Sequence, residues 1–462
     1  MKKYDVAILG GGPGGYVAAI RAAQLGKSTA IIDKDKLGGI CLNWGCIPTK
    51  ALLKNAEVLH YVKNSKQFGI NIPNYSVNFN ETIKRSRDVS KRLSKGIEFL
   101  MKKNQIDHIK GRGVFKSDKE IEVINGKNKE LVKADKIIIA TGARSRVLTD
   151  MEPDGKRIIT SKEAMNLKEV PKRMLIIGAG AIGAEFAYFY NQYGSKIHLI
   201  EMMDNILPIE DEDISKEVER SFISSGIKIY KKTRVIKIKK LKTKLKVYVE
   251  ISGQEKIIET DIVLNAVGVI GNIEKIGLED IGLETKNNAI SINDYNQTSI
   301  ENIYAIGDVS GPPWLAHVAS AQGHIAVEHA FGHFTNPLDY NNIPGCTYCQ
   351  PQVASVGMTE VKAKEVGHEV KVGRFNFSAS GKALAIGESY GFVKIIFDAK
   401  YGELLGCHIV GSEATELIAE LAVAKALETT WEEIATTVHA HPTLSEAIME
   451  AALDAYGQSI HQ

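Results

Sequence analysis

Residues 6–15 read VAILGGGPGG, and this stretch decides the fold. A short apolar run, expected to form a strand, leads into the pattern G-x-G-x-x-G, whose glycines stand at 10, 12 and 15. An Ala-rich segment follows to Gly26, and a second apolar run then ends at Asp33. A strand, a glycine loop, a helix and a second strand that ends in an acid form the unit that binds a dinucleotide.

The same arrangement occurs a second time. Residues 174–183 read MLIIGAGAIG, the following segment reaches Gly194, and the next apolar run ends at Glu201, each 168 positions after its counterpart. The glycines allow the tight turn, the close approach of the pyrophosphate and the packing of helix on strand, while the helix N-terminus binds the phosphates. Two copies predict two dinucleotide sites rather than two packing turns. Two methionines, not basic residues, follow Glu201, which favours NAD over NADP.

A cysteine pair follows the first unit, where residues 38–50 read GGICLNWGCIPTK. Five residues of regular helix rise about 7.5 Å, which exceeds the span of a disulfide, about 6.8 Å between Cα atoms. A Cys41–Cys46 bridge therefore requires a distorted segment, for which Gly45 and Pro48 supply the means. Such a strained bridge is easily reduced. Alone, the pair fits packing thiols equally well, but beside a dinucleotide loop the redox interpretation is favoured.

These motifs resemble the flavin-dependent pyridine nucleotide–disulfide oxidoreductases, from Tyr4 to about Tyr456. The first glycine loop and the segment after it are most similar to the members that oxidise protein-bound dihydrolipoamide. The resemblance implies that the first dinucleotide is FAD, held by Gly10, Gly12, Gly14, Gly15, Asp33, Gly39, Lys50, Gly113, Thr141, Gly142, Asp308 and Ala316. It implies that the second is NAD, held by Gly178, Gly180, Ile182, Gly183, Glu201, Val235, Val267 and Gly268.

Glu185 and Lys50 are further candidates. Glu185 stands in an otherwise apolar helix start, where a carboxylate is costly unless it is paired, although the helix N-terminus helps it. The resemblance pairs the two side chains and places Lys50 beside the flavin N5. The alternative is two unrelated solvated charges.

Near the end, residues 439–446 read HAHPTLSE. His441 precedes a proline and is held extended, so Glu446, at the start of the last predicted helix, could turn back to hydrogen-bond the imidazole and fix its tautomer. The resemblance implies that this pair is a catalytic His–Glu dyad that reaches the disulfide of the other subunit, and hence a homodimer. His439 and His317 match supporting positions of the family.

We therefore expect an α/β protein with two Rossmann-like dinucleotide-binding domains and a C-terminal α+β dimerisation domain. The FAD-binding domain covers 1–145 and is completed by a central segment at 275–343. The NAD-binding domain covers 146–274, and the dimer-interface domain covers 344–462.

The composition excludes several classes of protein. The 462 residues suggest about three domains, and a net charge of +3 does not indicate nucleic acid as a partner. The first apolar run is too short for a signal peptide, and glycines and Glu185 interrupt the apolar segment at 175–193, so we expect a cytoplasmic protein that does not contact the membrane.

Other notable residues are predicted to be structural. Cys346 and Cys349 are expected on one strand, where residues three apart face opposite sides and cannot bridge, and no metal site is expected. Cys407 is expected in the core. The Lys-rich stretch at 228–246 alternates with apolar residues, which indicates strands with a solvated face.

The implied reaction is FAD-dependent oxidation of protein-bound dihydrolipoamide by NAD⁺, as a component of 2-oxo acid dehydrogenase or glycine cleavage complexes. His441 would deprotonate the dithiol, Cys41 would be the interchange sulfur, and Cys46 the sulfur nearer the flavin. Expected partners are the lipoyl and subunit-binding domains of an E2 acyltransferase, or a lipoyl carrier protein. The alternatives are a reductase for glutathione or mercury, and a non-catalytic flavoprotein, which the intact Cys, His and Glu residues disfavour.

Overall fold

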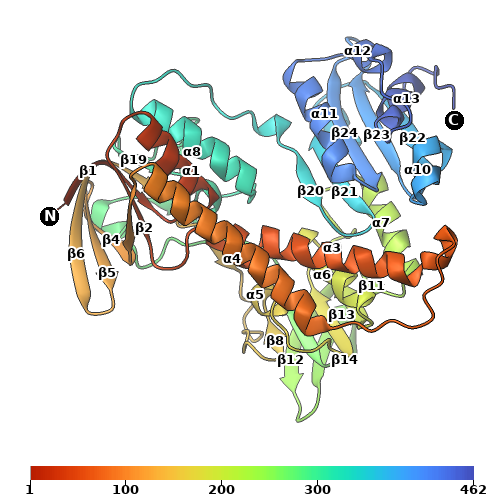
Figure 1. Cartoon of the computed structure of the whole chain (residues 1–462), viewed down its shortest axis with the longest axis horizontal. Helices are drawn as coiled ribbons and strands as arrows, with labels where there is room; N and C mark the ends of the chain where they lie inside the picture. Colours follow the sequence, from red (N-terminus) through yellow and green to blue (C-terminus); the bar gives the residue numbers. More distant parts are fainter. Residues whose placement is uncertain (1, 462) are drawn as a thin grey trace. The chain divides into compact units, whose positions relative to one another are not determined.

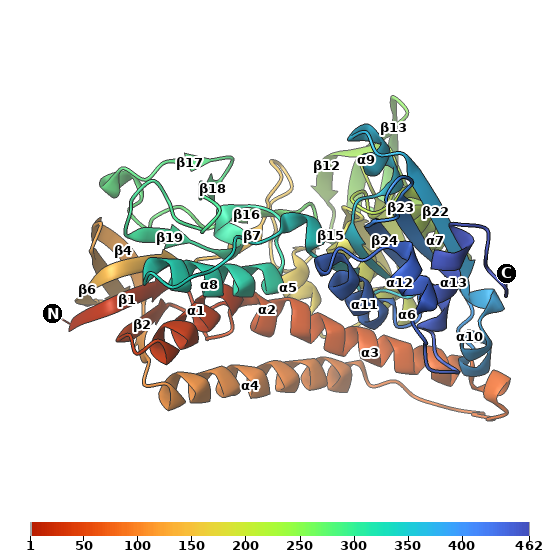
Figure 2. The same ribbon diagram turned by 90° about the horizontal axis from the view of Figure 1, so that it is seen from above.

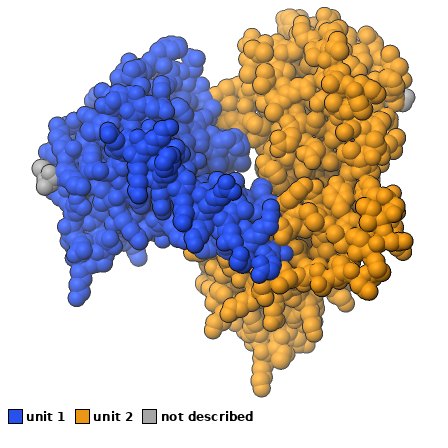
Figure 3. Space-filling model, in the orientation of Figure 1, with its two compact units in different colours: residues 1–51, 81–146, 268–338 blue, residues 52–80, 147–267, 339–462 orange. Residues whose placement is uncertain are grey.

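The computed structural model describes residues 2–461 and divides into two compact units, each made of three chain segments (Figure 3). The first unit comprises residues 1–51, 81–146 and 268–338. The second comprises residues 52–80, 147–267 and 339–462. No helix in the described part of the chain is both long and apolar enough to cross a membrane.

A seven-stranded sheet forms the centre of the first unit (Figure 1). Its strands are β3 (Asp107–Lys110), β2 (Thr29–Asp33), β1 (Lys2–Leu9), β6 (Asn128–Ile139), β5 (Glu120–Asn125) and β4 (Arg112–Ser117), with β19 (Ile303–Ala305) also paired to β6. The pairs from β3 to β6 and the pair β6–β19 are parallel, whereas β4 and β5 are antiparallel additions. Parallel strands need cover on both faces, and Val6, Ala7 and Ile8 are fully buried.

On one face of this sheet, α1 (Pro13–Gln24) and α8 (Ala316–Ala330) lie side by side (Figure 2), and Ile97 and Met101 of a third helix join the same core. The close approach of α1 and α8 depends on glycine, because a Cβ atom on Gly323 would lie 2.9 Å from the Gly14 carbonyl oxygen. The other face packs against residues of the central segment, among them Leu278 and Val309. The first predicted glycine loop therefore joins a buried parallel strand to a helix that is packed on the sheet.

The second unit contains a second parallel sheet and a small antiparallel one. The parallel order is β11 (Lys228–Tyr230), β10 (Lys196–Ile200), β9 (Arg173–Ile177), β15 (Ile262–Asn265) and β8 (Ile158–Ile159). The antiparallel sheet contains β12 (Thr233–Lys240), β13 (Leu245–Ile251) and β14 (Gln254–Thr260). Helices α6 (Ala181–Gln192) and α7 (Glu212–Ser224) follow β9 and β10. The Lys-rich stretch thus forms strands, as predicted.

The C-terminal part of the chain forms a five-stranded antiparallel sheet. Its order is β20 (Gly345–Thr347), β21 (Gln352–Gly357), β24 (Leu404–Gly411), β23 (Phe392–Asp398) and β22 (Val370–Asn376). Helices α11 (Ala414–Ala426), α12 (Trp431–Thr436) and α13 (Glu446–Asp454) share a core with it. Every residue of β23 and β24 is buried. Gly373 lets α13 approach β22, because a Cβ atom there would lie 1.8 Å from the Ala451 carbonyl oxygen.

The remaining elements lie in the connections between these strands and helices. Three α-helices lie between β2 and β3: α2 (Gly39–Trp44), α3 (Cys46–Lys63) and α4 (Phe79–Lys103). A short antiparallel ribbon joins β7 (Ala143–Ser145) to β16 (Val269–Gly271). The smaller elements are α5 (Ser161–Ala164), β17 (Thr285–Lys286), β18 (Ala289–Ile290), α9 (Glu360–Glu365) and α10 (Gly381–Ile386).

The cysteines outside the pair differ in part from expectation. Cys407 lies in β24 and is fully buried, as predicted. Cys346 lies in β20, but the strand ends at Thr347, so the expectation that Cys349 shares this strand is wrong. Instead Cys349 is buried in the following turn, where its thiol donates to the Pro351 carbonyl oxygen at 3.2 Å.

Candidate functional site

The first glycine loop has a backbone that only glycine permits. Gly10 has φ +111°, and a Cβ atom there would lie 2.1 Å from the Ala140 carbonyl oxygen. A Cβ atom on Gly15 would lie 1.9 Å from the Gly10 carbonyl oxygen. Gly12 is the N-cap of α1, and no side chain caps this terminus. The positive end of the helix is therefore left to an anionic ligand such as a pyrophosphate.

The second loop repeats this geometry. Gly178 has φ +95°, and its Cβ atom would lie 2.4 Å from the Ala266 carbonyl oxygen. A Cβ atom on Gly183 would lie 1.9 Å from the Gly178 carbonyl oxygen. Gly180 is the uncapped N-cap of α6, and Ile182 is partly exposed in its first turn. Both loops fit the phosphates of a dinucleotide.

The two predicted acids also hold the loops. Asp33 accepts a hydrogen bond from the Gly11 N–H at 2.6 Å, and Glu201 accepts one from the Ala179 N–H at 2.8 Å. These amides belong to the middle residues of the two loops. The acids were predicted for the ribose, and this second contact was missed, although the equal offset of acid and loop in the two copies was a signal for it.

Asp308 is the predicted FAD residue with the most unusual environment. It lies in a 3₁₀ turn, Gly307–Ser310, after β19, and its carboxylate accepts no hydrogen bond from the described residues. Burial raises the pKa of Asp308 to about 6. A desolvated carboxyl group without a protein partner suits a ligand that brings hydroxyl groups, as the ribityl chain of FAD does.

Of the other predicted FAD residues, Gly39 lies close to the first glycine loop, and the rest lie elsewhere in the first unit. Gly39 has φ +57° and approaches the loop, because its Cβ atom would lie 2.6 Å from the Gly12 Cα. Thr141 donates to the Asn272 carbonyl oxygen at 2.8 Å, and Gly142 follows it with φ +69°. Further from the loop, Gly113 packs in β4 against Leu9, and Ala316 is the first residue of α8, followed by His317.

The remaining NAD candidates are Val235, in β12 of the second unit, and Val267 and Gly268, at the point in the chain where the second unit ends and the first resumes. Val235 is in β12, beside a shift of strand register, and packs on the core of that unit. Val267 and Gly268 follow β15, where the Val267 N–H donates to the Asn265 side chain at 3.3 Å. Gly268 has φ +96°, so the chain turns there as only glycine does readily.

The Cys41–Cys46 segment is distorted at the predicted position. Helix α2 ends at Trp44, Gly45 has φ −145° and ψ −116°, and α3 begins at Cys46. Pro48 is not part of the break, because it lies inside the first turn of α3, where proline is tolerated. The break at Gly45 brings the two sulfur atoms together as hydrogen-bonded thiols.

Neighbouring groups shift the pKa of the Cys41 thiol. The hydrogen bond with the Cys46 sulfur and burial both raise the pKa of the Cys41 thiol, while the positive charge of Lys50 partly offsets them. Lys50 lies four residues after Cys46, on the same face of α3. The predicted reactive pair and its nearby cation are thus assembled within the first unit.

Glu185 belongs to the second unit. It lies in α6, is 4% exposed, and accepts a hydrogen bond from the Tyr348 N–H at 3.0 Å. A buried carboxylate in an apolar helix is thereby tied to the turn after β20. The predicted pairing of Glu185 with Lys50 stays a prediction.

His441 and Glu446 form the predicted dyad. The imidazole Nδ1 lies 2.9 Å from Glu446 Oε1, and the Thr443 N–H donates to Oε2 at 2.9 Å. The Thr443 N–H and His441 hold the pKa of Glu446 below its usual range, although burial opposes them. The His441 side chain is 78% exposed, and its contact with Glu446 uses Nδ1 rather than Nε2. His439 contacts Glu420 at 2.7 Å, which fits a supporting role.

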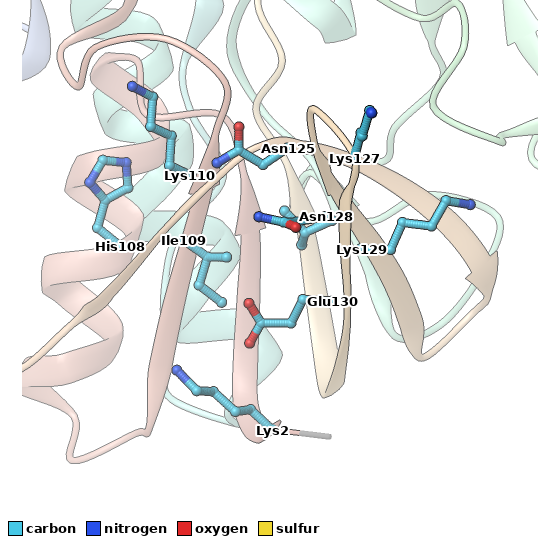
Figure 4. A pocket seen from close by; sticks show the side chains of 10 residues that line it. Lys2, His108, Ile109, Lys110, Asn125, Lys127, Asn128, Lys129 and Glu130 are labelled. Atoms are coloured by element: carbon cyan, nitrogen blue, oxygen red, sulfur yellow. The ribbon is translucent and has the colours of Figure 1, made fainter.

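A cavity of about 670 Å³ in the first unit holds none of the predicted site residues (Figure 4). His108 and Lys110 of β3 line one side, and Asn125 and Asn128 of the β5–β6 hairpin line another. Its surface charges are partly neutralised, since Lys2 pairs with Asp107 and Lys129 with Glu122. This cavity does not bring reactive groups together.

The sequence of this chain matches the models of a known protein family. Residues 4–323 match the model of the pyridine nucleotide-disulphide oxidoreductases, and residues 343–452 match the dimerisation domain of the same family. The chain belongs to this family, which confirms the predicted fold class, the enzyme class and the use of FAD and NAD. The dimerisation domain supports the predicted homodimer.

Individual relatives narrow the comparison. The chain is 48% identical to a dihydrolipoyl dehydrogenase of Rhizobium etli, covering 100% of this chain and 99% of that one. It is 45% identical to a dihydrolipoyl dehydrogenase of Bacillus subtilis, covering 99% of each. Among solved structures it is similar to LpdA from Mycobacterium tuberculosis, with a TM-score of 0.91 and 27% identity over 98% of this chain and 99% of that one.

Proposed function

We propose that this chain oxidises dihydrolipoyl groups with NAD⁺ through a disulfide between Cys41 and Cys46. The observation that carries the proposal is the hydrogen-bonded cysteine pair at the Gly45 break, in the same compact unit as the first glycine loop. The relatives at 43–48% identity, which are named dihydrolipoyl dehydrogenases, support the choice of substrate.

The thiol chemistry follows from the residues of this chain. His441, oriented by Glu446, accepts a proton from one thiol of the dihydrolipoyl group. The resulting thiolate attacks the Cys41 sulfur, the Cys41–Cys46 bond breaks, and the electron pair stays on Cys46 as a thiolate. The second lipoyl thiol then displaces Cys41, whose sulfur takes up the proton of that thiol, so the lipoyl disulfide closes and both cysteines are left reduced, Cys41 as a thiol and Cys46 as a thiolate. The first glycine loop, Asp33 and Asp308 would hold FAD, which would supply the means of two-electron transfer from this dithiol to NAD⁺.

The proposed contacts with the two cofactors are those that the sequence predicts. We assign the first glycine loop, Asp33 and Asp308 to FAD, and the second loop and Glu201 to NAD. We also propose the division into an FAD-binding domain at 1–145 completed at 275–343, an NAD-binding domain at 146–274 and a dimer-interface domain at 344–462.

The proposed partners follow from the exposed dyad and from the substrate. We propose that His441 of one copy serves the cysteine pair of a second copy, because its side chain is largely exposed. The lipoyl group would arrive on an E2 acyltransferase, whose subunit-binding domain would hold the dimer, or on a lipoyl carrier protein. We propose the cytoplasm as the compartment, because an easily reduced disulfide in a cytosolic protein is usually catalytic rather than structural.

The proposal is tested by steady-state turnover of the purified protein. We expect activity with NAD⁺ plus dihydrolipoamide, and its loss in Cys41→Ser. Cys346→Ser is the matched control, because it removes a partly buried cysteine outside the pair and should retain activity. Activity with NADPH plus oxidised glutathione alone would instead identify a glutathione-type reductase, and full activity of Cys41→Ser would refute the mechanism.

A further inference from the structure

One face of α4 is lined with hydroxyl groups that the proposed reaction does not use. Thr82, Ser86, Ser90 and Ser94 follow one another at intervals of four residues and are at most 7% exposed. Residues four apart share a helix face, and buried polar groups need partners. Helix α4 runs alongside α2 and the first turn of α3, so this face meets the segment that carries Cys41 and Cys46 (Figure 2).

The hydroxyl groups bond to both sides of the Gly45 break. Ser94 donates to the Asn43 side-chain oxygen at 2.9 Å, and Ser86 donates to the Pro48 carbonyl oxygen at 3.0 Å. The Asn43 amide in turn donates to the Leu37 and Gly39 carbonyl oxygens at 3.1 and 3.0 Å. Asn43 is 6% exposed and stands between the two cysteines, so α4 holds the chain from the start of α2 to the first turn of α3.

Arg87 makes the strongest of these contacts. Its Nη1 donates to the Asn43 carbonyl oxygen at 2.7 Å, and its guanidinium lies 5.1 Å from the centre of the Trp44 ring. Because the helix breaks at Gly45, the last carbonyls of α2 lack their usual partners within the helix. A cation is favoured at such a C-terminus. Arg87 thus caps α2 at the residues that separate Cys41 from Cys46.

The position of Arg87 is costly, which argues for a specific role. Its Nε is buried without a hydrogen-bond partner, and burial lowers the pKa of Arg87. An arginine that only joined α4 to the rest of the unit could lie at the surface, as Arg92 of the same helix does. The shortest contact of Arg87 is instead with the Asn43 carbonyl oxygen, in the backbone between the two cysteines, while its Nη2 lies 3.5 and 3.4 Å from the hydroxyl oxygens of Ser86 and Ser90.

We propose that Arg87 is a positioning residue for the Cys41–Cys46 pair. By holding the Asn43 carbonyl group and the Trp44 ring, it keeps the backbone between the sulfurs in the conformation from which the disulfide closes. Without Arg87, the backbone of residues 43–45 gains conformational freedom, and the two sulfur atoms come within bonding distance less often. The effective concentration of one thiol toward the other then falls. This inference rests on the proposed redox function of the pair.

The test compares Arg87→Met with Arg92→Met, an exposed arginine of α4 that has no side-chain contact among the described residues. The purified full-length proteins are equilibrated with graded mixtures of reduced and oxidised dithiothreitol, and free Cys41 is quantified by alkylation and peptide mass spectrometry. We expect Arg87→Met to lower the constant for disulfide closure by about tenfold, the effect of losing one charged hydrogen bond. Arg92→Met should stay within about twofold of wild type.

Two further readouts separate positioning from a merely structural role. Arg87→Lys, which keeps the charge and one donor, should recover part of the closure constant. In turnover, Arg87→Met should lower kcat for dihydrolipoamide and leave KM for NAD⁺ unchanged. A lower melting temperature with an unchanged closure constant would show that Arg87 is only structural and would overturn the proposal.

The experiments distinguish failure of the Arg87 proposal from failure of the proposed function. Wild-type protein that closes the disulfide but fails to oxidise dihydrolipoamide would refute the proposed function. In that case the closure constants of the variants would still decide whether Arg87 positions the pair.

Discussion

Replacing Lys394 by Met should destabilise the sheet of the C-terminal region strongly. Lys394 lies in β23, its side chain is 4% exposed, and its Nζ lies 2.9 Å from Asp211, 2.7 Å from Asp213 and 2.9 Å from Glu360. Although burial disfavours the ammonium group, hydrogen bonds to these three carboxylates raise the pKa of Lys394. Although burial opposes it, Lys394 likewise holds the pKa of Asp211 below its usual range. Methionine would keep the apolar stem and remove the charge.

The magnitude follows from the exposure of the three acids. Asp213 and Glu360 are 40% and 29% exposed, so both recover hydration, and Glu360 also retains Lys364 at 2.6 Å. Asp211 is 3% exposed, and the hydrogen bonds that it keeps among the described residues come from the N–H groups of Asp213 and Glu360, at 3.1 and 3.3 Å. One buried carboxylate is left uncompensated, which costs about 3–5 kcal/mol of the free energy of unfolding.

Urea unfolding measures this loss, and hydrogen exchange of the β23 and α7 amides locates it. Lys362→Met is the matched control, because Lys362 pairs with Glu365 at 59% and 61% exposure and should cost at most about 1 kcal/mol. Adding Asp211→Asn to Lys394→Met should restore much of the stability, since the unpaired charge is then gone. A loss in Lys394→Met no larger than in the control would refute the reasoning.

Three further changes test other parts of the molecule. Burial raises the pKa of Glu210 from 4.5 to about 7, so the folded protein keeps a proton that the unfolded chain loses, and stability should fall as pH rises from about 4.5 to 7. Glu210→Gln should flatten this slope in melting curves at pH 5 and 8, and an unchanged slope would contradict it. Gly10→Ala, whose Cβ atom would meet the Ala140 carbonyl oxygen, should lower the FAD content measured by absorbance. Glu446→Gln should lower kcat about 100-fold with KM for NAD⁺ unchanged; a fall below about tenfold would argue against the dyad.

Features that depend on neighbouring residues could be read from the sequence. The glycine loops are short patterns whose backbone requirements are local, as the positive φ of Gly10 and Gly178 shows. The Gly45 break could be inferred because a disulfide cannot span five residues of regular helix. The hydrogen bond between His441 and Glu446 joins residues only five apart, and the proline between them limits the chain's conformations.

Features that depend on packing could not be read in this way. Arg87 contacts Asn43 across 44 residues, and Lys394 contacts Asp211 across 183. Nothing in the local pattern distinguishes these two cations from solvated ones, because burial and partners are properties of the assembled sheets and helices. The same holds for Asp308, whose raised pKa comes from the surrounding protein. Adjacent residues determine short-range backbone geometry, whereas desolvation and long-range pairing arise only when distant segments pack together.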